Sequence, residues 1–97
     1  MQLNEFQQST REKLEALLRR KGLAGQFGSG GGPSEFALTL VVSGFESWIY
    51  PDGAGILGAE VDERFEIYDY DSLDALQAAY LHSFDRLLGP DLAGSSP

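Results

Sequence analysis

The sequence predicts an α+β domain in which two helices flank an antiparallel sheet, with the C-terminal helix packed on one sheet face. Three patterns lead to this class: apolar residues at helical spacing up to residue 22, a two-residue period from Phe36 onward, and a second helical pattern after Asp71. The length of 97 residues fits one domain. Residues 1–22 and 35–89 are therefore assigned to one domain, with a loop over 23–34 and a disordered tail over 90–97.

Residues 1–22 are expected to form an amphipathic helix. Its buried face is marked by apolar residues at helical spacing, namely Leu3, Phe6, Leu14, Leu17 and Leu18. Two starts of this helix remain open. If Asn4 is the N-cap, it would pair with Gln7 three residues on. If Ser9 is the N-cap, it would pair with Glu12, at the spacing of a capping box. The end is expected at Gly22, which follows three basic residues that suit the negative end of the helix dipole.

The segment 23–34 is expected to be a flexible glycine-rich loop. Six of the twelve residues from 22 to 33 are glycines, which lose much backbone entropy on ordering and offer no side chain to pack. A phosphate-binding loop is not supported, because no strand precedes the segment, no helix follows it and no Gly-Lys-Ser/Thr closes it. Phe27 is the exception in this segment, since an aromatic side chain here either docks on the core or stays exposed.

Three or four antiparallel strands are expected between residues 36 and 68. The segments with a strand pattern are 36–43, 46–50, 54–57 and 60–68. Gly44 is either a tight turn or a bulge between the first two segments. Pro51 and Gly53 occupy the second and fourth positions of a type I turn, which predicts a hairpin. In the last segment Val61, Phe65 and Ile67 face inward, and Glu63 interrupts that apolar face.

A second helix is expected to follow the sheet. Asp71 or Ser72 would cap it, and Gly89-Pro90 would end it. Its buried stripe consists of Leu73, Leu76, Tyr80, Phe84 and Leu87.

The charge is divided unevenly along the chain. Residues 1–33 hold three acidic and five basic side chains, a balance of +2, whereas residues 34–97 hold twelve acidic and two basic ones, a balance of −10. The acidic part would repel nucleic acid and anionic lipid, and it would attract basic protein surfaces. We therefore expect a basic protein partner, a class that includes nucleic-acid-binding proteins and nucleases, and no direct binding of nucleic acid.

The residue types needed for most catalytic and metal sites are scarce. There is no cysteine, which excludes disulfides and thiolate chemistry. A Ser-His-Asp arrangement would need the single histidine, His82, to face a serine, and Ser83 is only its neighbour in the chain. The segment that starts at Asp69 resembles the opening of a calcium loop. It has Leu73 at the fifth position and Tyr80 at the twelfth, where oxygen ligands are needed. We expect no metal, no cofactor and no enzymatic activity.

No sequence feature points to a membrane. No apolar run approaches about 18 residues, and the first residues lack the basic and apolar regions of a signal peptide. We therefore expect no membrane partner and a cytoplasmic location.

The outer row of the last predicted strand is the main candidate binding surface. Glu60, Asp62 and Glu66 would form a regular row of negative charge, because alternate residues of a strand share a face about 6.6 Å apart. Asp69 and Asp71 would extend this row. Its spacing is comparable to that of backbone phosphates, so the row would mimic a nucleic acid. The alternative is a solvated strand face whose charges prevent edge aggregation.

Aromatic residues form a second set of candidate contacts. Trp48 and Tyr50 share a strand face with Glu46, and Tyr68 and Tyr70 flank the acidic row. Tyrosine and tryptophan are enriched at interface hot spots. They are also ordinary sheet residues, so Trp48 is alternatively a core residue.

Three functional hypotheses follow. The first is a non-catalytic protein-binding inhibitor of a basic protein, the functional type represented by immunity proteins and phage-encoded inhibitors of bacterial defence. The second is a self-assembling homodimer, in which the basic residues 19–21 of one copy meet the acidic sheet of another. The third is a small enzyme or ligand-binding domain built on paired carboxylates.

Overall fold

A computed structural model describes residues 3–29 and 36–91, which form two helices and one five-stranded antiparallel sheet. The helices are α1 (Glu5–Lys21) and α2 (Leu73–Leu88), and the strands are β1 (Gln26–Ser29), β2 (Leu38–Val42), β3 (Phe45–Tyr50), β4 (Gly53–Leu57) and β5 (Asp62–Glu66). A short 3₁₀ helix, η1 (Ile67–Asp69), follows β5. The α+β class is confirmed, but the sheet has five strands where three or four were expected.

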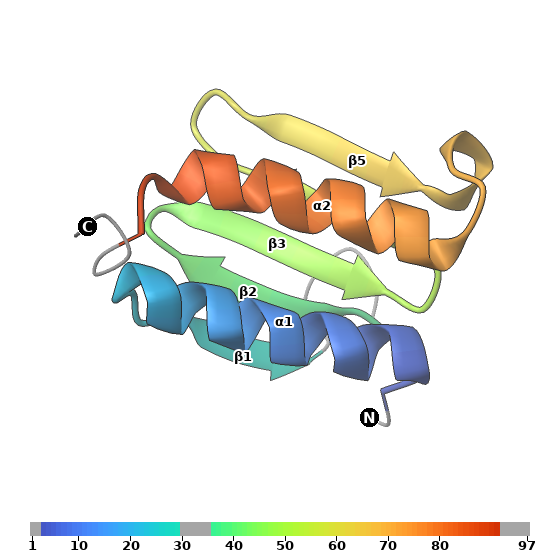
Figure 1. The fold of residues 1–97 in the computed structure, drawn as a ribbon, viewed down its shortest axis with the longest axis horizontal. Helices are drawn as coiled ribbons and strands as arrows, with labels where there is room; N and C mark the ends of the chain where they lie inside the picture. The colour runs from blue at the N-terminus through green and yellow to red at the C-terminus, as the bar shows by residue number, and fades with distance from the viewer. Residues whose placement is uncertain (1–2, 30–35, 92–97) are drawn as a thin grey trace.

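The sheet is a meander in which each strand pairs with the next strand along the chain. Its spatial order is β1-β2-β3-β4-β5, and all four pairs are antiparallel. Figure 1 shows α1 and α2 side by side on one face of the sheet and running in the same direction. The helix α1 contacts β3, and α2 contacts β4 and β5, so the prediction that α2 packs on one sheet face is confirmed.

The hydrophobic core lies between the two helices and this face of the sheet. Its large, fully buried apolar side chains are Leu14 of α1, Leu38, Leu40, Ile49 and Ile56 of the sheet, and Leu76, Tyr80 and Phe84 of α2. The ring of Tyr80 lies between those of Phe65 and Phe84, with centroid distances of 5.6 and 5.8 Å. Each such side chain contributes about 1.5–3 kcal/mol by leaving water, so this single core accounts for the position of both helices.

Both helices begin and end at residues that satisfy their terminal backbone groups. At α1 the side chain of Asn4 accepts a hydrogen bond from the backbone N–H of Gln7, which selects the first of the two predicted starts. Gly22 follows with a positive φ of 66°, as its position predicts. At α2 the cap is Ser72, whose hydroxyl accepts from the backbone N–H of Ala75.

Two tight turns set the register of the central strands. Ser43 and Gly44 both have positive φ, 52° and 83°, and they connect the paired residues Val42 and Phe45. This is the two-residue turn that follows the right-handed twist of a hairpin, so Gly44 belongs to a turn and not to a bulge. The predicted hairpin at Pro51 is also present, because Tyr50 pairs with Gly53.

The strand β1 corrects the prediction that residues 23–34 form a flexible loop throughout. Residues 26–29 pair with β2, and Phe27 lies opposite Leu40. The guanidinium carbon of Arg11 lies 4.9 Å from the centre of the Phe27 ring and covers it from α1. Docking of one aromatic side chain thus orders a short strand within a glycine-rich segment. Of the rest of the predicted loop, residues 23–25 belong to no helix or strand, and residues 30–34 lie outside the described residues.

The expected strand over 60–68 is also shorter in the structure. Glu66 pairs with Gly53, the first residue of β4, so no further β4 residue is left to pair with the chain after Glu66. The backbone therefore turns into η1. Glu63, the charged residue on the apolar face of this segment, contacts α2, where its carboxylate accepts a hydrogen bond from the Ser83 hydroxyl.

Candidate functional site on the open sheet face

The sheet face opposite the helices, here called the open face, carries the largest share of the predicted site. In the described part of the chain no helix or strand lies over it, since both helices pack on the other side (Figure 1). Strand alternation and register place on the open face Thr39, Val41, Glu46, Trp48, Tyr50, Gly53, Gly55, Leu57, Asp62, Arg64 and Glu66. Val41 is 50% exposed and Leu57 is 41% exposed, so this face is partly apolar as well as charged.

Three rows of paired residues cross β3, β4 and β5 on the open face. The first row is Glu46–Leu57–Asp62, the second is Trp48–Gly55–Arg64, and the third is Tyr50–Gly53–Glu66. The strand β4 contributes glycine to the second and third rows. In the second row the indole of Trp48 covers Gly55, whereas in the third row no side chain rises from β4 between Tyr50 and Glu66. The gap between the flanking side chains spans two strand spacings, or about 10 Å.

A groove of about 300 Å³ occupies this gap, and we call it the β3–β5 groove. Its lining includes Trp48 and Tyr50 from β3, Arg64 and Glu66 from β5, and Asp52 and Tyr68 from the flanking turn and η1. Tyr68 is 87% exposed, so its ring stands free at the rim. The groove therefore combines aromatic rings with carboxylates on an otherwise regular sheet.

The two glycines of β4 on the open face have no space for a side chain, and Gly53 forms part of the groove lining. A Cβ at Gly53 would lie 2.9 Å from the backbone oxygen of Phe65. A Cβ at Gly55 would lie 2.7–2.9 Å from three indole atoms of Trp48. The indole thus lies over Gly55 on the open face, and Trp48 is not a core residue.

The electrostatics of the groove are set by one cation among several carboxylates. The guanidinium Nε of Arg64 lies 3.6 Å from a carboxylate oxygen of Asp62, and both side chains are largely exposed. Partial burial raises the pKa of the Tyr50 phenol above its ordinary value of 10.0, and the nearby charge of Arg64 opposes that effect. Tyr50 therefore stays neutral, as a hydroxyl donor and an aromatic wall.

The structure brings together six of the ten residues predicted to bind a partner. Glu46, Trp48, Tyr50, Asp62 and Glu66 share the open face, and Tyr68 joins them at the rim of the groove.

The other four predicted residues lie elsewhere. Glu60 is exposed in the turn before β5, Asp69 is exposed at the end of η1, and Asp71 is exposed before the cap of α2. Tyr70 packs against the core. The predicted acidic row is therefore interrupted, and the acidic groups of the open face are distributed over β3 and β5 instead. The signal that sequence reasoning missed is the Gly53-x-Gly55 spacing, which puts two glycines on one face of a strand.

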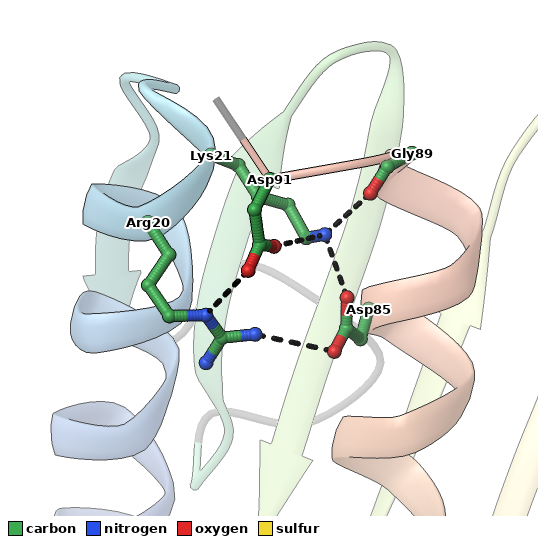
Figure 2. A network of polar contacts seen from close by, with 5 residues as sticks. All are labelled: Arg20, Lys21, Asp85, Gly89 and Asp91. Carbon is green, nitrogen blue, oxygen red and sulfur yellow. Dashed lines mark hydrogen bonds and ion pairs between the residues drawn. The ribbon is translucent and has the colours of Figure 1, made fainter. Parts of the chain in front are cut away.

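A second polar cluster lies at the C-terminal ends of both helices (Figure 2). The ammonium group of Lys21 contacts Asp85 at 2.6 Å and Asp91 at 3.0 Å, and it donates a hydrogen bond to the carbonyl of Gly89. Arg20 contacts the same two carboxylates, each at 3.2 Å. The Lys21 side chain is only 2% exposed, so its ammonium group is compensated by Asp85, Asp91 and the Gly89 carbonyl and not by water.

The pKa values of this cluster follow its geometry. The hydrogen bond to Asp85 raises the pKa of Lys21 above 10.5, against an opposing effect of burial. Hydrogen bonds from Lys21 and then Arg20 lower the pKa of Asp91 below 3.8. Asp91, which falls within the predicted tail, is thus fixed to α1, and residues 92–97 lie outside the described residues. This cluster joins α1, α2 and the following segment, which indicates a structural role.

The described residues offer few groups for other chemistry. Among residues 3–29 and 36–91, no three histidine or carboxylate side chains are grouped to hold a metal ion. Neither described helix is long and apolar enough to cross a bilayer. His82 is exposed on the outer side of α2.

Comparison of the chain with known family models, curated proteins and solved structures gave no match.

Proposed function

We propose that this chain is a non-catalytic protein-binding module that inhibits a basic protein by covering it with the open face. The observation that carries the proposal is the combination of acidic and apolar groups on a sheet face that no described element covers. Exposed apolar patches bounded by polar groups are typical of protein–protein contact surfaces. Glu46, Asp62 and Glu66 outnumber the single cation Arg64 on this face, which favours a basic partner.

The distribution of positive charge supports an external partner over a second copy. In the homodimer hypothesis, basic residues 19–21 of one copy meet the acidic sheet of another. Arg20 and Lys21 are already engaged within the chain by Asp85 and Asp91. Packing two open faces against each other would also bring like charges together, which is unfavourable.

The proposal is tested by affinity capture from a bacterial lysate with a matched pair of charge variants. The variant E46K/D62K reverses the two carboxylates of the first cross-strand row, and E5K/E12K makes the same change in net charge on exposed positions of α1. We expect a basic protein to be captured by the wild type and by E5K/E12K, and lost with E46K/D62K. With the purified partner, association should slow as salt rises, because surface charges are screened.

Circular dichroism and thermal unfolding of each variant establish that it is folded before capture. A partner that binds E46K/D62K as well as the wild type contradicts the proposal, and so does a partner that is acidic. Loss of the captured protein's own activity at one equivalent of this chain would establish inhibition. Full activity in the saturated complex would reduce the function to binding alone.

A further inference from the structure

We propose that the β3–β5 groove receives the guanidinium group of an arginine side chain from the partner. This inference rests on the proposed function and names the contact at its centre. Its test varies Tyr68 and Glu66, which lie outside the charge row Glu46–Leu57–Asp62, so the two proposals can fail separately.

The shape of the groove favours a long, thin side chain. Its floor at Gly53 is backbone, and the flanking positions are Tyr50 on β3 and Glu66 on β5. The indole of Trp48 lies over Gly55 and limits the groove on one side. The opposite end is bounded by the hairpin turn and by Tyr68 of η1. An inserted side chain would thus pass between aromatic walls before its head group meets polar atoms.

The chemistry of the lining favours a planar cation. Three aromatic residues, Trp48, Tyr50 and Tyr68, line the groove. Guanidinium groups stack on aromatic rings more readily than other cations do. The carboxylates of Asp52 and Glu66 offer acceptors for charge-assisted hydrogen bonds. Arg64 also lines the groove, and the Asp62 carboxylate 3.6 Å from its Nε offsets part of its charge.

The same residues argue against other occupants. A carboxylate or phosphate would meet Asp52 and Glu66, and the groove offers only the already paired Arg64 as a cation. A second copy of this chain would bring its own acidic open face to the groove. An arginine from a basic partner is the occupant whose charge and shape both complement the lining.

The test is a titration of the full chain with a capped hexa-arginine peptide, followed by tryptophan fluorescence. Trp48 is the only tryptophan, so its emission reports directly on the groove. We expect a saturable change in emission with the wild type. The Y68A variant should bind the peptide roughly fivefold more weakly, as expected for the loss of one cation–π contact, and Y68F should restore binding. E66Q should also weaken binding, because it removes a charged acceptor.

Two controls separate the groove from the rest of the surface. V41A removes an exposed apolar side chain of the open face outside the groove, and E12Q removes a carboxylate from α1. Both should bind hexa-arginine like the wild type. Since Tyr68 is 87% exposed, Y68A should fold normally, and thermal unfolding checks this.

Three results would overturn the groove assignment. The first is an affinity for hexa-arginine that is unchanged in both Y68A and E66Q. If E46K/D62K still loses the captured partner in that case, the proposed function stands while the groove inference fails. The second is no emission change with hexa-arginine at all. The third is self-association through the groove. Analytical ultracentrifugation would then show a dimer of the wild type and a monomer of Y68A.

Discussion

The indole of Trp48 lies over Gly55 of the neighbouring strand, where a Cβ would come within 2.7–2.9 Å of three ring atoms. The position of the ring therefore depends on the absence of a side chain at residue 55. Because the same ring limits the β3–β5 groove, a single glycine controls the shape of the candidate site.

The G55A variant should move the indole away from the sheet and into solvent. We expect a red shift of the tryptophan emission and a change of no more than about 1 kcal/mol in the free energy of unfolding, since alanine also lowers the entropy cost of a strand glycine. Fluorescence spectra and chemical denaturation measure the two quantities. G28A is the matched control, because Gly28 also lies in a strand but its nearest neighbour is Thr39. An unchanged emission maximum in G55A would contradict the role of this glycine.

The buried pair Ser47 and Tyr80 should show strong energetic coupling. Their hydroxyl oxygens lie 2.6 Å apart, and the Ser47 hydroxyl also donates to the carbonyl of Gly55 at 2.6 Å. Each of S47A and Y80F should cost about 1–3 kcal/mol, because it leaves a buried polar group without its partner. The double variant should cost less than the sum of the single variants, by about 0.5 kcal/mol or more. Strict additivity in denaturant unfolding would show that the hydrogen bond contributes nothing.

Replacing the buried ammonium group at the helix ends should destabilise the fold. K21M keeps the aliphatic part of the side chain but removes the ammonium group, so Asp85 and Asp91 keep only Arg20 and the carbonyl of Gly89 loses its donor. We expect a loss of about 1–2 kcal/mol at neutral pH, limited because both carboxylates remain partly solvated. R19M changes an exposed basic residue of the same helix turn and should be close to wild type. Equal stabilities of the two variants would contradict the structural role of Lys21.

The stability difference between wild type and K21M should depend on pH in two ranges. The lowered pKa of Asp91 gives a contribution that is present above its ordinary value of 3.8 and is lost as the pH falls through the lowered pKa. The raised pKa of Lys21 gives a contribution that is present below 10.5 and is lost as the pH rises through the raised pKa. The difference should be largest between about pH 4 and 10, as measured by denaturant unfolding across that range. A difference that grows in acid would have the wrong sign.

The F27A variant should release the edge strand β1. Phe27 faces Leu40 and lies under Arg11, and these are the side-chain contacts that distinguish β1 from the glycines around it. We expect faster amide hydrogen exchange over residues 26–29, with the exchange of β3 and β4 unchanged. Hydrogen-exchange mass spectrometry resolves these segments. Protection of β1 in F27A would show that backbone pairing alone holds the strand.

Much of this fold follows from local patterns in the sequence. The cap at Asn4, the end at Gly22 and the hairpin at Pro51 each depend on residues within one turn, and all are present. The buried stripe of α2 was also predictable, because Leu76, Tyr80 and Phe84 stand at helical spacing and are fully buried. Such features need no knowledge of distant partners.

The features that sequence reasoning missed depend on contacts between distant segments. The strand β1 forms because Arg11 and Leu40 meet Phe27, and neither is its neighbour in the chain. The groove exists because the register of three strands aligns Gly53 with both Tyr50 and Glu66. The acidic row was predicted from one strand alone, and that strand is shorter because its partner β4 spans only Gly53–Leu57.

The meander also bears on the order in which the molecule folds. From β2 to β5 every strand pairs with its successor, so the loops that close are short. Lys21 and Asp91, in contrast, are 70 residues apart in the chain, and closing that loop costs more conformational entropy. We therefore expect the two helix ends to join after the sheet has formed. A variant such as K21M would then speed unfolding while leaving the refolding rate nearly unchanged.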